Sequence, residues 1–175
     1  GLPSQAVAIE DILAEYTGDL VSNINDDAGK LRQFLSEAYN NGNGVEYVLL
    51  AGANIPIRKG CGFHNTTHDL NNPPTDLYFS DFDGNWNVDG DLSYGERYAQ
   101  YGTYMNDCDS IDLITEIYIG RIMARNEWEV KNWTRKLIIY EQNPGNGDGT
   151  YLSKALFTLS AGYVSCNDGG GSPIV

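Results

Sequence analysis

Residues 28–51 constrain the fold more than any other part of the chain, because a helical stripe is followed there by a buried strand. Over residues 28–39 apolar side chains recur at intervals of three and four, which predicts a helix with one face on a core: Leu31, Phe34, Leu35 and Ala38. Residues 45–51 then form a short, nearly continuous apolar run, typical of a parallel strand that is buried on both faces. Helix, short loop and buried strand are half of a crossover unit, so the sequence predicts an α/β fold.

Regular secondary structure is predicted again in the second half of the chain. Residues 116–120 favour a strand, and Asn126 with Glu129 has the spacing of a capping box at the start of a helix. That helix is expected to turn one face toward the core: Val130, Trp133, Leu137, Ile138 and Glu141. Residues 156–160 predict a third strand, and residues 5–16 predict a short strand or turn that passes into a helix.

The composition indicates one folded domain and excludes two classes of partner. With 175 residues, of which 41% are hydrophobic and 20% charged, the chain can bury one sizeable core. The 24 Asp and Glu residues outnumber the 11 Lys and Arg residues and give a net charge of −13, so the protein repels nucleic acid and anionic membrane surfaces. No apolar run approaches the roughly 18 residues that a spanning helix requires, so no membrane span is expected.

Residues 59–110 differ in character from the segments around them. They are rich in Gly, Asn, Asp, Pro and Tyr, and neither the helical nor the strand period persists along them. Loops of this length in compact domains are usually functional or disordered, and the many aromatic residues argue against disorder. We therefore predict a single domain segment over residues 1–175 that carries a long Asp/Asn/Gly-rich loop region at residues 59–110.

Side chains that carry oxygen alternate within this loop, and we predict that they hold a structural Ca²⁺ ion: Asp81, Asp83, Asn85, Asn87, Asp89 and Asp91. Calcium takes about six to eight oxygen ligands, and this alternation offers several on one side of the chain. Counted from Asn85, residues 85–96 match the EF-hand loop template, with Asn in place of the first Asp and Glu96 as the bidentate carboxylate.

Two other interpretations of this loop stay open. An overlapping frame would use four of the same residues, namely Asp81, Asp83, Asn85 and Asn87. An acidic turn without any cation would serve only to make the surface soluble. No amphipathic helix flanks residues 85–96, so a calcium loop here would lack the paired helices of a calcium sensor.

The cysteines give little evidence for catalysis within the chain. Cys61, Cys108 and Cys166 form neither a disulfide framework nor a Cys-x-x-Cys metal motif, and they allow at most one bridge. Cys61 and His64 are near each other in sequence, but catalytic partners usually come from different loops, so exposed loop residues are the favoured interpretation. Cys108 lies between two aspartates, whose negative field disfavours the reactive thiolate. No catalytic residue is predicted in this chain.

Several blocks of the sequence, in this order and spacing, together resemble the gingipain-like cysteine peptidases of family C25, which are related to caspases. The blocks are residues 46–56, 75–86, 89–96, 111–113 with 116–121, and 136–141. The resemblance extends over roughly residues 5–162, nearly the whole chain. It implies a three-layer α/β/α domain of the caspase type, an extracellular or cell-surface location, and cleavage of protein or peptide substrates by a cysteine thiolate with a histidine base.

The resemblance also implies that this chain is only the N-terminal part of the catalytic domain. In the family the histidine lies in a Gly-His-Gly motif and the nucleophile in an Ala-Cys motif, both further along than the strand that matches residues 156–160. Neither motif occurs in this chain. The catalytic pair is therefore expected beyond residue 175 or on a partner chain. Because an open α/β sheet has its site at the carboxyl ends of the strands, the loops after Ala51, Gly120 and Ser160 are expected to face the cleft.

Two functions from other classes compete with the peptidase. The first is a non-catalytic, calcium-stabilised surface or binding module that keeps the same scaffold. The second is a carbohydrate-binding loop that uses Trp86, Tyr94 and Tyr98, with calcium as a bridge.

Overall fold

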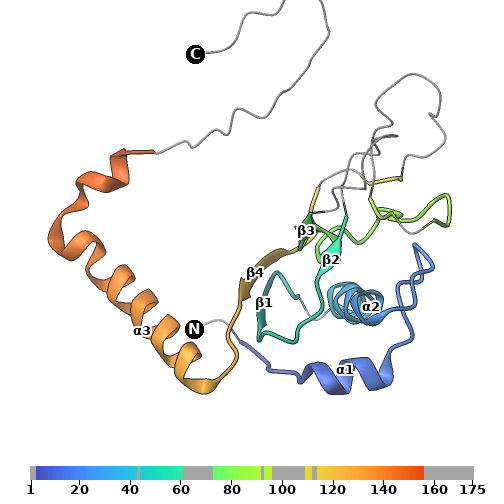
Figure 1. The fold of residues 1–175 in the computed structure, drawn as a ribbon, viewed down its shortest axis with the longest axis horizontal. Coiled ribbons are helices and arrows are strands. Elements are labelled where there is room, and N and C mark those ends of the chain that lie inside the picture. Colours follow the sequence, from blue (N-terminus) through green and yellow to red (C-terminus); the bar gives the residue numbers. More distant parts are fainter. Residues whose placement is uncertain are drawn as a thin grey trace, which may run out of the picture. The chain divides into compact units, whose positions relative to one another are not determined.

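The structure, a computed structural model, describes residues 3–42, 44–60, 73–91, 93–95, 109–111 and 114–155. Its helices and strands follow one another in this order (Figure 1): α1 (Ile9–Glu15), α2 (Asp27–Asn40), β1 (Tyr47–Ala51), β2 (Arg58–Lys59), β3 (Pro74–Thr75), η1 (Leu77–Phe79), β4 (Tyr118–Ile122), α3 (Glu127–Gln142), η2 (Pro144–Gly147) and η3 (Gly149–Ser153). The η elements are 3₁₀ helices. The chain divides into two compact units, residues 1–130 and 131–175. Among the residues described, no helix has the length and apolar character needed to cross a membrane.

A parallel pair of strands is the centre of the first unit. β1 pairs with β4 in parallel, in a register that runs from Tyr47 opposite Tyr118 to Ala51 opposite Ile122. β2 and β3 form a separate, short antiparallel pair. The predicted order of helix, loop and strand is confirmed, since α2 leads directly into β1. The α/β character of the fold is confirmed with it.

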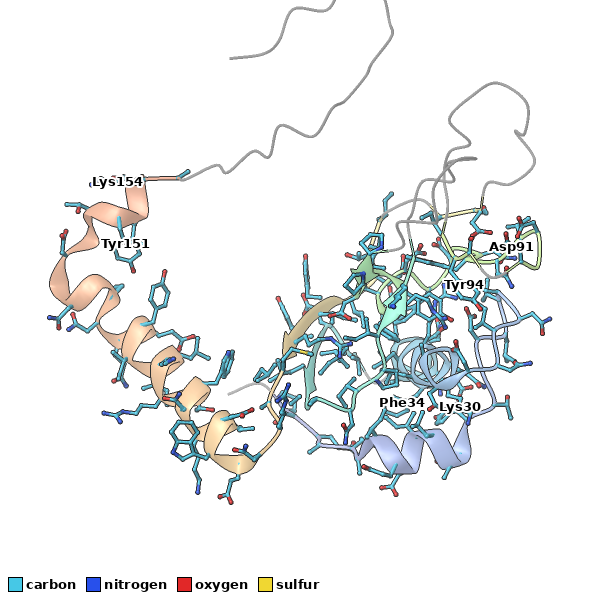
Figure 2. All side chains as sticks on the ribbon, viewed as in Figure 1. Lys30, Phe34, Asp91, Tyr94, Tyr151 and Lys154 are labelled. Carbon is cyan, nitrogen blue, oxygen red and sulfur yellow. The ribbon has the colours of Figure 1, made fainter. Side chains whose placement is uncertain are left out.

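Helix α2 supplies one wall of the core, as its apolar spacing predicts. The Asp26 carboxylate caps it by accepting a hydrogen bond from the Gly29 N–H at 2.8 Å. Leu31 and Leu35 are buried in the core cluster, together with Ile12 of α1. Figure 2 shows Phe34 between α2 and α1, where its ring meets the ring of Tyr16 edge to face at 5.6 Å. The helix therefore packs on α1 and on η1, and its buried stripe belongs to the same core cluster as Leu50 of β1.

The prediction that the first strand is buried on both faces is met on one face only. Val48 and Leu50 face the core, whereas Tyr47 and Leu49 are 61% and 57% exposed. The reason is that β1 has β4 as its neighbour, and α1 and α2 both lie on the same side of this pair. The part of the first unit that the structure describes leaves the other face uncovered.

The cap that begins α3 is present, with one departure from the capping box: Glu129 reaches back to the N–H of Arg125, not to that of the cap residue Asn126. The Glu129 N–H donates to Asn126 Oδ1 at 3.0 Å, and Glu129 Oε2 accepts from the Arg125 N–H at 2.7 Å. No residue of α3 is buried, so the packing of its apolar face on a core stays a prediction. In the second unit the ring of Tyr140 lies 6.2 Å from that of Tyr151.

Several sequence-based predictions lie outside the described residues. They concern the third strand at residues 156–160, and the side chains of Cys61, His64, Glu96, Tyr98, Cys108 and Cys166.

A substitution at Gly29 tests how closely α2 approaches the turn before it. A Cβ at this position would clash with the carbonyl oxygen of Ile24, so we expect Gly29→Ala to lower the free energy of unfolding by about 1–3 kcal/mol. The opposite sign is expected from helix propensity alone, which favours Ala over Gly by about 1 kcal/mol. Urea denaturation measures the difference, and Lys30→Ala in the same helical turn is the control. A stabilised Gly29→Ala variant would contradict this packing.

Candidate metal centre

Three carboxylates from two distant segments converge in the first unit. Oxygen atoms of Asp81, Asp83 and Glu116 all lie within 4.8 Å of one another. Asp81 follows η1 and is fully buried, Asp83 is exposed, and Glu116 is half-buried just before β4. The backbone brings them together, because the Glu116 N–H donates to the carbonyl oxygen of Ser80 at 2.9 Å. Asp81 and Asp83, two of the seven predicted ligands, thus lie close together. Glu116, which was not among the predicted ligands, lies beside them.

The electrostatics of this cluster favour a cation. Burial raises the pKa of Asp81, and the charge of Asp83 raises it further, despite hydrogen bonds from the Gly84 N–H and the Trp86 indole. Burial also raises the pKa of Glu116, as do the charges of Asp83 and Asp81, despite the hydrogen bond from the Phe82 N–H. The charged form of both carboxyl groups is therefore disfavoured in the folded protein. A hard divalent cation would remove this penalty, and carboxylate oxygens are the ligands such cations prefer.

The loop that follows Asp83 is organised by its own side chains. Asn85 Oδ1 accepts from the Asn87 N–H at 3.0 Å, Asp89 Oδ1 from the Asp91 N–H at 3.1 Å, and Asp91 Oδ1 from the Ser93 N–H at 2.6 Å. These are Asx-type turns, in which a side-chain oxygen accepts a hydrogen bond from the backbone N–H two residues further along the chain. The backbone therefore loops repeatedly through these residues and does not run extended, which is one of the two backbone forms that the alternation of oxygens allows.

The EF-hand frame is only partly matched by this geometry. Gly90 has φ +79°, the turn conformation that the template needs at its glycine. Asn87 Oδ1 is buried and has no hydrogen-bond partner among the described residues, as expected for an oxygen kept for a ligand. Asp89 and Asp91 are exposed and do not belong to the converging group (Figure 2 shows Asp91 in the outer part of the loop). Glu96 lies outside the described residues.

A buried arginine of α2 supports the acidic turn from the core side. The Arg32 guanidinium donates to the carbonyl oxygens of Asp81 and Gly84, the latter at 2.7 Å. Its other end forms an ion pair with Asp19 and donates to Ser22 Oγ. The sequence periodicity could have indicated Arg32, because this charged residue lies three positions before Leu35 on the apolar face of the helix.

Trp86 anchors the same turn. It is fully buried, its backbone N–H donates to Ser22 Oγ at 2.9 Å, and its indole N–H donates to Asp81 Oδ2 at 3.0 Å. Gly95, at φ +67°, lies against the indole ring, which a Cβ would meet. The alternative of a carbohydrate-binding loop therefore loses Trp86, because this ring has no exposed face.

A second buried arginine links the aromatic residues to the cap of α2. Arg58 forms a bidentate ion pair with Asp26 at 2.8 and 2.6 Å. Its guanidinium lies 4.4 Å from the ring centres of both Tyr78 and Tyr94, between the two rings. Burial raises the pKa of Tyr78 far above its ordinary value, so its hydroxyl stays protonated and donates to Asp19 at 3.0 Å. The ring of Tyr94 thus already packs against a cation of the protein itself, the Arg58 guanidinium.

Comparison with known proteins gives one match. The chain matches the family model described as peptidase family C25 over residues 1–171. No curated protein and no solved structure matches the chain significantly. The match covers both compact units and the whole of the candidate metal centre.

The Asp26–Arg58 pair provides a pH-dependent test of the network. Burial opposes the charged form of Asp26, but the hydrogen bonds from Arg58 and Gly29 prevail and lower the pKa of Asp26 below its ordinary value of 3.8. A lowered pKa gives stability that is fully present above pH 3.8 and is lost as the pH falls through the folded-state value. Asp26→Asn keeps a capping side chain, so we expect a loss of about 1–2 kcal/mol at pH 7, reduced by solvent because Asp26 is half exposed.

Chemical denaturation at several pH values measures this difference. The control is Asp27→Asn, since Asp27 is more exposed and lies 3.6 Å from Lys30; it should change the stability by less than about 0.5 kcal/mol. The wild-type protein and Asp26→Asn should converge below pH 3.8. A difference that stays constant down to pH 2 would contradict the ion pair as the cause.

Proposed function

Because the chain belongs to peptidase family C25, the gingipain family, we propose that it is the N-terminal part of an extracellular cysteine endopeptidase. The observation that carries this proposal is the family match over residues 1–171. At the level of the family, the activity is hydrolysis of peptide bonds by a cysteine nucleophile, and the substrate is a protein or peptide. We propose that the residues that set cleavage specificity lie mostly beyond residue 175.

We place the catalytic histidine and cysteine beyond residue 175 or on a partner chain. The sequence contains neither the Gly-His-Gly nor the Ala-Cys motif of the family. What this chain contributes is scaffold: the parallel pair β1 and β4, the covering helices α1 and α2, and the acidic turn. The parallel pair supports this division, because it gives a sheet edge at which both strands end in the same direction.

The complete domain is proposed to have three layers, α/β/α. Support comes from the uncovered face of the parallel pair, where Tyr47 and Tyr118 stack with their ring centres 5.2 Å apart beside the exposed Leu49. Parallel sheets are normally covered on both faces, since their strands are apolar on both. A second layer over these side chains would complete the arrangement.

We further propose that a structural Ca²⁺ ion binds at the acidic turn, with Asp81, Asp83 and Glu116 as carboxylate ligands. Their convergence, the raised pKa of Asp81 and Glu116, and the buried, unpaired Asn87 Oδ1 support a cation in this region. The ion would neutralise part of the net charge of −13. It would also fix the segment before β4 to the turn after η1. Its proposed role is structural, because no catalytic group lies in this cluster.

Activity of the full-length protein tests the peptidase proposal. We expect thiol-dependent hydrolysis of unlabelled protein and fluorogenic peptide substrates, abolished by alkylation of the cysteine. The purified 175-residue chain should hydrolyse no peptide. A full-length protein without thiol-dependent turnover would favour the alternative, a non-catalytic calcium-stabilised binding module. Turnover by the 175-residue chain alone would contradict the division of labour and point back to Cys61 and His64.

Calcium titration of the chelator-stripped protein tests the metal proposal. It also distinguishes a site at Asp81, Asp83 and Glu116 from a site in the EF-hand frame at residues 85–96. At about 100 times the dissociation constant, Ca²⁺ should raise the free energy of unfolding by about 2.7 kcal/mol. Asp83→Asn and Glu116→Gln should each remove most of this gain, because each deletes a charged ligand. Asp89→Asn is the matched variant from the EF-hand frame and should leave the gain intact. Loss of the gain in Asp89→Asn alone would shift the site to residues 85–96, and no gain in the wild type would refute calcium binding.

A further inference from the structure

One guanidinium at the end of β4 joins three segments of the first unit. Arg121 forms a bidentate ion pair with Asp76, with Nε 2.9 Å from Oδ2 and a terminal nitrogen 2.8 Å from Oδ1. The same guanidinium donates to the carbonyl oxygens of Ile55 at 3.2 Å and Pro56 at 2.8 Å. The side chain of Arg121 is only 11% exposed and that of Asp76 is 30% exposed, so the guanidinium is largely buried while its carboxylate partner keeps some contact with water. A bidentate carboxylate and two carbonyls together take four hydrogen bonds, which the five N–H groups of a planar guanidinium can supply and the three of a lysine ammonium cannot.

The carbonyls that Arg121 holds belong to the loop that leaves β1. This loop begins at Gly52, whose N–H still pairs with the carbonyl oxygen of Ile122 at 3.0 Å and whose φ of +142° turns the chain away from the strand. It ends at Pro56, which restricts the backbone further. Between these fixed points, Ala53 and Asn54 are exposed at the tip of the loop. The base of the loop is therefore rigid and its tip is accessible.

The position of this loop gives it a functional meaning. β1 and β4 are parallel and their paired residues end at Ala51 and Ile122, so their carboxyl ends form one edge. Ligands of open α/β sheets bind outside this edge. A buried ion pair adds little net stability to a loop, because apolar packing of the same volume is often as stable. What the forked guanidinium of Arg121 gives the loop is one defined geometry.

We propose that Arg121 is a positioning residue for substrate binding, which holds residues 52–56 so that the tip at Ala53 and Asn54 forms one wall of the peptide-binding cleft. The inference rests on the proposed function. The wall it defines is uncharged, offering a methyl group, a side-chain amide and backbone amides to a bound peptide. Such groups suit the main chain of an extended peptide, which carries one donor and one acceptor at nearly every residue. Arg121 itself touches no substrate and acts through the loop.

Steady-state kinetics of the full-length peptidase tests the proposal. Arg121→Lys keeps the charge and loses the fork, and Asp76→Asn removes the partner of the fork. Each should raise KM for a peptide substrate about tenfold, the scale of one charge-assisted hydrogen bond, while kcat changes by less than about threefold. The double variant should be little worse than either single variant, because both remove the same interaction. Arg125→Lys, the same change at an exposed position, is the matched control and should leave KM unchanged.

A second variant keeps the test independent of folding. Asn54→Ala leaves Arg121 and its partners intact, and should raise KM without lowering the melting temperature. If Arg121→Lys and Asp76→Asn lower the melting temperature but leave KM of the folded enzyme unchanged, Arg121 is merely structural and the proposal is wrong. A KM unchanged in Asn54→Ala would also overturn it. A wild-type protein without any turnover would instead refute the proposed function, on which the inference rests.

Discussion

The structure of the first unit depends on the burial of Arg32. A buried guanidinium is costly unless its donors are paired, so the segments around it must present acceptors. Asp19 supplies a carboxylate from the turn before α2, and Asp81 and Gly84 supply carbonyl oxygens from the turn after η1. One side chain thereby joins a helix to two turns that are far apart in sequence. The acidic turn is held from the core side and has little freedom to spread its charges.

This constraint explains why the carboxylates remain close despite their repulsion. Both oxygens of Asp81 already accept hydrogen bonds, from the Gly84 N–H and the Trp86 indole, and these bonds fix the carboxylate beside Glu116. In an unconstrained loop the same charges would separate into solvent. Here the turn, the indole and the approach to β4 hold them together. Burial raises the pKa of Asp81 and of Glu116, and the neighbouring charges that this geometry holds in place raise it further.

Local patterns in the sequence predicted the elements but not the contacts between distant segments. The periodicities over residues 28–39 and 45–51 correctly located α2 and β1, because each pattern is complete within one element. The alternation of oxygens after Asp81 identified the acidic turn, but Asx turns divide those residues between two places. Glu116 could not be found this way, since it meets Asp81 through a backbone bond to Ser80. The exposed face of β1 depends on which neighbours cover it, and periodicity does not carry that information.

The acidic turn and the carboxyl edge of the sheet are connected through one short segment. Residues 76–80 run in the opposite direction to residues 116–121, because Asp76 binds Arg121 at one end and Ser80 binds Glu116 at the other. A five-residue strand spans roughly 16 Å and is stiff along its length. β4 is paired with β1 from Tyr118 to Ile122, between Glu116 and the loop that follows β1. A cation at the acidic turn would fix the segment that enters this pair, while the bonds from Arg121 hold the loop at residues 52–56 at the carboxyl end.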